Sequence, residues 1–289
     1  MARRFVISTF LLIALLMLAH PVWAQNGEFA RQPGAVYDSD RKGEKPAPAP
    51  RHDISGTWEP AKTASDATQG GGAKAMPSDG KPEHRLPYTP LGQKTFQSHK
   101  PLNGVTGVPA ALTNDPLPGC DPAGLPRILL HDFRSSQIIQ MPNEVAILYE
   151  RDKKWRVVWT DGRKLPEINA DLEPRWWGYS VGKWVDDYTF VADTVGLDER
   201  TWVDNAGRPH SDALHVIEEY HRADRDHLEM TITIDDPKMY TKPWIALNKL
   251  PLRLQAPGFD IREMECVPSE TSSYNEGFSD AAAGIDKAK

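Results

Sequence analysis

Three side chains that can transfer protons or bind a metal lie close together in the segment 209–215. They are His210, Asp212 and His215. A carboxylate beside an imidazole can orient it as a general acid or base, so these residues are the candidate catalytic group. We predict no metal there, because the spacing matches no metal-ligand motif. The preceding residues, 205–209, are typical of a turn, and a purely structural role is the alternative.

A polar pair and several aromatic side chains are candidates for ligand binding. Asp161 and Arg163 could receive an anionic or hydroxylated ligand, although an aspartate followed by glycine is also typical of a tight turn. Trp177, Tyr179 and Trp202 can stack on a sugar or an aromatic ring, or fill a β core instead. We therefore expect a small aromatic or sugar-like ligand in a pocket of the β-barrel predicted below.

The adjacent carboxylates Glu218 and Glu219 must face opposite sides of a strand. One of them then points into the barrel, where a buried charge needs a partner. Arg127 and Arg163 are the candidate partners.

Motifs that would name a reaction are absent from the sequence. It has no Gly-x-Ser-x-Gly, His-Glu-x-x-His, phosphate-binding loop or dinucleotide fingerprint, and we predict no cofactor. A ligand-binding protein is the first hypothesis. An enzyme, either a hydrolase or a lyase/isomerase, is the alternative; its acid–base pair would be one of the two histidines with Asp212 or Asp161. A structural or partner-binding protein of the cell envelope is the third. The oligomeric state stays open.

Residues 1–24 have the features of a cleavable signal peptide. Arg3 and Arg4 precede an apolar run, 10–19, and a small-residue cleavage site ends at Ala24. No later segment is apolar enough to span a bilayer. The net charge of −6 argues against nucleic acid as a partner. We expect a periplasmic or secreted protein that has no membrane contact after signal cleavage.

The chain has two cysteines, Cys120 and Cys266. In an exported protein a disulfide between them is the default expectation, because the compartment is oxidising. A single reactive thiol is the alternative, but neither cysteine has an activating neighbour in the sequence.

The predicted elements form one β domain over 53–270. Residues 25–52 are polar and proline-rich, which predicts a disordered leader, and 271–289 is expected to be a flexible tail. One short helix is predicted over 89–99, with Thr89 as its cap. Short strands separated by charged turns predict an all-β, up-and-down antiparallel barrel. The expected strands are 53–58, 127–133, 136–141, 144–151, 155–160, 177–185, 188–196, 213–222, 227–235, 244–254 and 261–266. For 213–222 a helix is the competing interpretation.

Gly56-Thr57-Trp58 ahead of this meander resembles the Gly-x-Trp entry strand of the lipocalin-like (calycin) barrels. A wider pattern resembles a family of exported bacterial signal-peptide proteins; it includes the segments 159–163, 178–184, 198–202, 209–215 and 233–244. This resemblance covers about 53–270. It implies a periplasmic or secreted β-barrel and no activity, so no site residue comes from it.

The two long connections of the meander, 161–176 and 197–212, should mark the functional end of the barrel. Two strands separate them, so in an up-and-down barrel both leave from the same end. We therefore expect His210, Asp212, Asp161 and Arg163 around one rim, with His215 and Tyr179 just below it.

Overall fold

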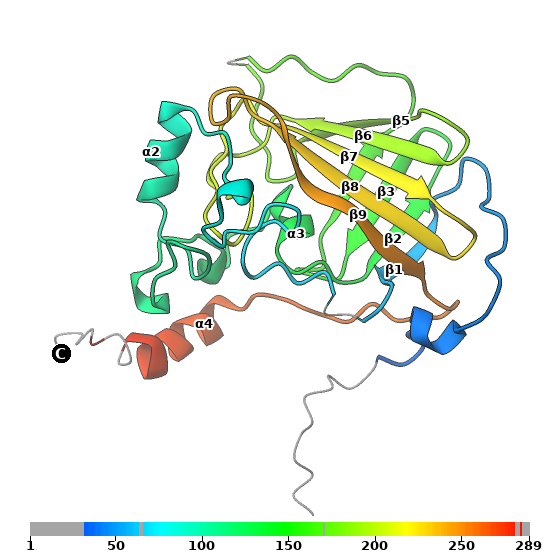
Figure 1. Ribbon diagram of the computed structural model, residues 1–289, viewed down its shortest axis with the longest axis horizontal. Coiled ribbons are helices and arrows are strands. Elements are labelled where there is room, and N and C mark those ends of the chain that lie inside the picture. The colour runs from blue at the N-terminus through cyan, green and yellow to red at the C-terminus, as the bar shows by residue number, and fades with distance from the viewer. Residues whose placement is uncertain (1–31, 64–65, 170, 281–283, 285–289) are drawn as a thin grey trace, which may run out of the picture.

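The computed structural model describes residues 32–63, 66–169, 171–280 and 284. The predicted signal peptide, 1–24, lies outside the described residues. Within the described ranges, nine strands form one closed barrel, in which the last strand pairs with the first (Figure 1). The strands are β1 (Gly56–Pro60), β2 (Ser136–Gln140), β3 (Glu144–Tyr149), β4 (Trp155–Trp159), β5 (Tyr179–Trp184), β6 (Thr189–Val195), β7 (His215–Arg222), β8 (His227–Asp235) and β9 (Trp244–Leu254).

The pairing of β4 with β5 is parallel, whereas every other neighbouring pair is antiparallel. A closed ring with an odd number of strands cannot alternate direction all the way round, so one pair must be parallel. The prediction of an up-and-down antiparallel barrel is therefore correct for eight of the nine pairings and wrong for this one. The connection 160–178 consequently runs from one end of the barrel to the other.

This topology gives the barrel two unlike ends. At the turn end, short connections join β2 to β3, β5 to β6 and β7 to β8. At the loop end lie the long connection between β1 and β2, the β6–β7 loop (196–214) and the β8–β9 loop (236–243). The connection between β1 and β2 carries most of the helical residues (Figure 1).

Strand alternation places one face of each strand inside the barrel. On β8 the side chains of Leu228, Met230, Ile232 and Ile234 are all fully buried, while the residues between them are partly exposed. The same alternation is seen in 215–222, which form the strand β7 within the predicted range 213–222, rather than a helix. The interior is thus a core of apolar side chains that also encloses a few polar ones.

The helices differ in part from the prediction of a single one. Helix α2 (Pro90–Ser98) agrees with it, and the Thr89 side chain accepts a hydrogen bond from the backbone N–H of Gly92. Two more are α3 (Arg127–Leu130) and α4 (Pro268–Tyr274). Shorter helical turns are η1 (Asp38–Arg41), η2 (Pro82–His84), η3 (Ala110–Leu112), η4 (Leu117–Gly119) and the π-helical turn η5 (Asn275–Ser279).

Two predicted strands are wrong. Residues 127–133 begin with α3, whose four residues are all buried. A short apolar run that is buried on every side has no periodicity to distinguish strand from helix. Residues 261–266 form no strand; Met264 alone makes an isolated bridge, to Arg151.

Both flanking segments pack on the barrel. The described part of the predicted leader, 32–52, follows its outer surface (Figure 1), and Asp38 in it interacts with His227 and Arg253. After β9 the chain returns along the barrel to the loop end, where a disulfide joins Cys120 to Cys266 as predicted. None of the helices in the described ranges is both long and apolar enough to cross a bilayer.

Candidate functional site

His210 is a buried residue of the β6–β7 loop. It is 4% exposed, its Nε2 lies 2.7 Å from the Thr201 hydroxyl, and its Nδ1 lies 3.2 Å from the carbonyl oxygen of Ser211. Burial lowers the pKa of His210. Both ring nitrogens therefore already have partners within the loop.

The other two members of the predicted catalytic group have separate partners. Asp212 is exposed and pairs with Lys238. The carboxylate that binds this loop is the buried one of Asp236, which accepts hydrogen bonds from the N–H (2.6 Å) and the hydroxyl (2.9 Å) of Ser211. His215 lies on the outer face of β7, with Nε2 2.8 Å from the carboxylate of Asp193 on β6. The loop is thus organised by Asp236, and the predicted triad is not assembled by any of these contacts.

The prediction that one rim carries all the candidate residues is wrong. Asp161 and Arg163 form an exposed pair (Oδ2–Nη2 2.6 Å) just after β4, at the turn end, and the Arg163 guanidinium lies over the ring of Trp159. His210 and Asp212 lie in the β6–β7 loop, at the opposite end. The parallel β4–β5 pair is the physical reason, because it reverses the parity on which the prediction depended.

The three aromatic candidates have separate partners. Trp177 stacks on Tyr149 with 5.7 Å between ring centroids. Tyr179 lies beneath the guanidinium of Arg175 and donates its hydroxyl hydrogen to the carbonyl oxygen of Glu173. Trp202 is buried, stacks on His99 and lies 5.4 Å from the Arg127 guanidinium carbon.

Inside the barrel, Glu218 is the inward carboxylate of the adjacent pair. Its partner is Arg156 on β4, not Arg127 or Arg163 as predicted. The Tyr220 hydroxyl donates to Glu218 (2.7 Å), and Arg156 donates to Tyr149 (2.9 Å). Arg156 also donates to the hydroxyls of Ser180 and Thr194. The barrel interior is therefore filled at this level by a hydrogen-bonded cluster.

A cavity of about 480 Å³ lies at the loop end, between the barrel and α4. It falls in the size range typical of small-molecule sites. We call it the loop-end cavity. Its apolar lining includes Leu102, Ala110, Leu117 and Pro118 from the β1–β2 connection and Tyr274 from α4. Its polar lining includes Asp115, Arg127, His131, Arg151, Asn205, Glu270 and Thr271, and the disulfide contributes Cys266.

Several side-chain nitrogens line this cavity. Arg127 is 1% exposed and binds Asp115 through two parallel hydrogen bonds of 2.6 Å. It also donates to the side chain of Asn205 (3.1 Å). His131 follows α3, and its buried Nδ1 has no hydrogen-bond partner in the described structure. Burial, reinforced by the positive charges of Arg151 and Arg127, lowers the pKa of His131 to about 3, so its imidazole is neutral at pH 7.

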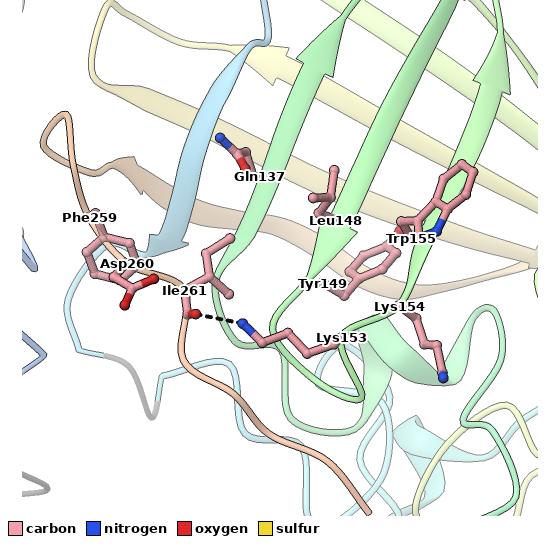
Figure 2. A pocket seen from close by; sticks show the side chains of 9 residues that line it. All are labelled: Gln137, Leu148, Tyr149, Lys153, Lys154, Trp155, Phe259, Asp260 and Ile261. Atoms are coloured by element: carbon pink, nitrogen blue, oxygen red, sulfur yellow. Dashed lines mark hydrogen bonds between the residues drawn. The ribbon is translucent and has the colours of Figure 1, made fainter.

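A smaller groove of about 280 Å³ lies on the outer face of the barrel (Figure 2). Its lining includes Trp155 of β4, which is 63% exposed, and the returning C-terminal segment around Phe259. Lys153 crosses it and donates to the carbonyl oxygen of Ile261 (2.8 Å). A third hollow, of about 370 Å³, lies between η2 and α2 and includes Tyr88 and Arg208. Neither is as large as the loop-end cavity.

Sequence reasoning missed the residues of the loop-end cavity. Arg127 and His131 lie four positions apart. One helical turn brings such residues together, whereas in the strand predicted over 127–133 they would be about 13 Å apart on one face. Arg151 lies at the end of the predicted strand 144–151. Within the described ranges, no three His, Cys, Asp or Glu side chains converge on a possible metal position.

The chain matches no protein-family model, and neither the curated proteins nor the solved structures include a significant match to it.

Proposed function

We propose that this chain is an exported protein that binds a small molecule in the loop-end cavity. The observation that carries the proposal is the cavity itself, which is lined by apolar side chains and by residues with buried, unpartnered nitrogens. Ligand sites typically combine a largely apolar lining with a few placed polar groups. The expectation of a site within the barrel is replaced here by a site at its end.

The cross-links that hold the cavity walls also support a site that is formed before the ligand binds. The disulfide between Cys120 and Cys266 ties the start of α4 to the β1–β2 connection. The Arg127–Asp115 pair fixes the opposite side. A site whose walls are held in place loses less conformational entropy on binding.

The acid–base alternative has less support. His210 has partners on both nitrogens, Asp212 pairs with Lys238, and His215 lies on the outer face of the barrel. Catalysis by such a pair requires the two groups to be within hydrogen-bond reach of each other and of a substrate. No contact of these residues favours that arrangement.

We also propose that the barrel is lipocalin-like and that the protein is periplasmic or secreted. Gly56 opens β1, and Trp58 is fully buried beneath the guanidinium of Arg222 (4.6 Å to the ring centroid). The parallel β4–β5 pair is a departure from an up-and-down meander. The disulfide favours an oxidising compartment.

The test is to fill the cavity with a larger side chain and to measure whether ligands still bind. Ala110 is exposed, lines the cavity and opens η3, so Ala110→Trp can occupy the cavity without disturbing the core. Leu112→Trp, at the other end of η3 and not part of the lining, is the matched control. A panel of aromatic, sugar-like and aliphatic compounds is screened by thermal shift and native mass spectrometry. We expect hits that Ala110→Trp weakens and Leu112→Trp retains; hits that survive Ala110→Trp, or no hits, would contradict the proposal.

A further inference from the structure

The two arginines that line the loop-end cavity, Arg127 and Arg151, differ in whether a carboxylate neutralises their charge. Arg127 has a dedicated counter-ion, since both oxygens of Asp115 bind its terminal nitrogens. That pair is almost fully buried, with side-chain exposures of 2% and 3%. A paired, buried arginine of this kind is a fixed part of the wall.

Arg151, at the β3–β4 turn, has no such partner. Within the described part of the chain its guanidinium makes no ion pair and no side-chain hydrogen bond, and its Nε is buried. The nearest carboxylates that act on it are Asp152 and Asp132, and Asp132 is already paired with Arg134 (2.7 Å). Burial is the largest influence on the pKa of Arg151 and lowers it, and Arg127 and Arg134 add to this effect. A half-buried cation without a counter-ion is costly for a protein to maintain.

Two further buried nitrogens lie beside it. The Nε of Arg127 has no acceptor in the described structure, and Nδ1 of His131 has no hydrogen-bond partner there. Buried polar atoms without partners are rare in folded proteins, and a missing ligand or ion is one of their ordinary explanations. All three side chains line the same cavity.

The rest of the lining has a different chemistry. Leu102, Leu117 and Tyr274 present apolar surface, and Glu270 on α4 adds one carboxylate. Glu270 would repel a ligand with several negative charges. A ligand with one anionic group and an apolar body fits both the cationic and the apolar parts of the lining.

We propose that the loop-end cavity binds an organic monocarboxylate, with its carboxylate on Arg151 beside His131 and its apolar body against Leu117 and Tyr274. The inference rests on the proposed function and specifies its ligand class. Arginine suits this role because its planar fork can hold a carboxylate through two hydrogen bonds. The apolar body contributes affinity by leaving water.

The experiment compares pairs of probes that differ only in charge. Octanoate is paired with octanamide, and hydrocinnamate with hydrocinnamamide, and each is titrated against the full mature chain by calorimetry and native mass spectrometry. We expect each carboxylate to bind at least about tenfold more tightly than its amide, because a charge-assisted hydrogen bond is worth more than a neutral one.

The variants assign the effect to one side chain. Arg151→Gln is expected to weaken carboxylate binding about tenfold or more and to leave amide binding unchanged. Arg151→Lys, which keeps the charge but not the fork, should fall between the two. Arg200→Gln is the control; it removes the same charge from an exposed residue at the same end of the barrel. Melting curves establish that each variant is folded.

The outcomes separate this inference from the proposed function. If the amides bind as tightly as the carboxylates and Ala110→Trp blocks both, the cavity is a binding site but not for an anion, and the inference is overturned alone. If Arg151→Gln and Arg200→Gln weaken the carboxylates equally, the effect is general electrostatics and the inference is likewise wrong. If no probe binds, or none responds to Ala110→Trp, both the inference and the proposed function are contradicted.

Discussion

Arg156 and Glu218 face each other across the inside of the barrel, where their side chains are 2% and 0% exposed. The residues come from β4 and β7, 62 positions apart in the chain. The cluster around them uses the hydroxyls of Tyr149 and Tyr220 to complete the hydrogen bonding. A buried ion pair of this kind links the two halves of the barrel on either side of the parallel β4–β5 pair.

Removing one partner of that pair should strongly destabilise the barrel. Glu218→Ala leaves the Arg156 charge buried without a counter-ion, and we expect a loss of about 3–5 kcal/mol in the free energy of unfolding. Urea denaturation measures it. The double variant Arg156→Met, Glu218→Leu removes both charges and should cost much less. A Glu218→Ala variant within about 1 kcal/mol of wild type would show that the pair is not buried as described.

His210 and Asp161 should respond differently to truncation. His210→Ala removes the ring that joins the Thr201 hydroxyl to the Ser211 carbonyl, and it should cost about 1–3 kcal/mol. Asp161→Ala breaks an exposed pair and should cost less than about 1 kcal/mol. Thermal melts of the two single variants decide between a structural and a catalytic role for His210. A stable His210→Ala variant that loses an activity would favour the catalytic role.

Gly92 in α2 should not tolerate a side chain, although alanine is the better helix former. A Cβ at this position would lie 2.0 Å from the carbonyl oxygen of Met239, so the helix packs directly on the β8–β9 loop. We expect Gly92→Ala to cost about 1–3 kcal/mol by chemical denaturation. Gln97→Ala, on the exposed side of the same helix, is the control and should be neutral or slightly stabilising.

The disulfide should account for a measurable part of the stability. Cys120 and Cys266 are separated by 146 positions, and closing so long a loop stabilises by about 3–5 kcal/mol in the chain-entropy model. We expect the Cys120→Ser, Cys266→Ser variant to melt at a lower temperature, and reductant to have no further effect on it. Intact mass after alkylation checks the bond itself. Two alkylated thiols in protein isolated without reductant would refute it.

The contacts of the segment 32–52 should weaken above neutral pH. Burial alone would lower the pKa of His227, but hydrogen bonds to Asp38 and Asp224 outweigh it and raise this pKa above the ordinary 6.5. The stabilisation by protonated His227 is therefore complete below pH 6.5 and is lost as the pH rises through the raised value. Burial raises the pKa of Asp38, but hydrogen bonds from His227 and Arg253 outweigh it and lower this pKa below 3.8, so the contribution of Asp38 is lost only on strong acidification.

The measurement is the exchange of amide hydrogens in residues 36–42 as a function of pH, corrected for intrinsic rates. Exchange should accelerate above pH 6.5 in the wild type more than the correction predicts. Asp38→Asn should remove most of this extra dependence, and Glu83→Gln, at an exposed carboxylate elsewhere, should not change it. Equal pH profiles for the wild type and Asp38→Asn would contradict the assignment.

The sequence by itself determined the parts of this structure that depend on local patterns. Alternation over 213–222 and 227–235 predicts strands because a half-buried strand needs a period of two, and Thr89 before Pro90 predicts the start of α2 through capping. The pairing of Cys120 with Cys266 followed from export and from the count of two. Each of these inferences depends only on neighbouring residues or on the number of cysteines.

The tertiary structure alone decided how the elements close and where the cavity lies. Closure of an odd number of strands requires one parallel pair. Here the pair is β4 with β5, and it places Asp161 at the end of the barrel opposite His210. The local sequence of either segment gives no sign of this. The loop-end cavity joins segments around 102–118, 127–131, 151, 205 and 266–275, which no sequence spacing relates. A run such as 127–130, buried on every side, is compatible with helix or strand, and only the packing around it selects one. Sites of this kind depend on contacts between distant segments, and such contacts exist only once the chain has folded.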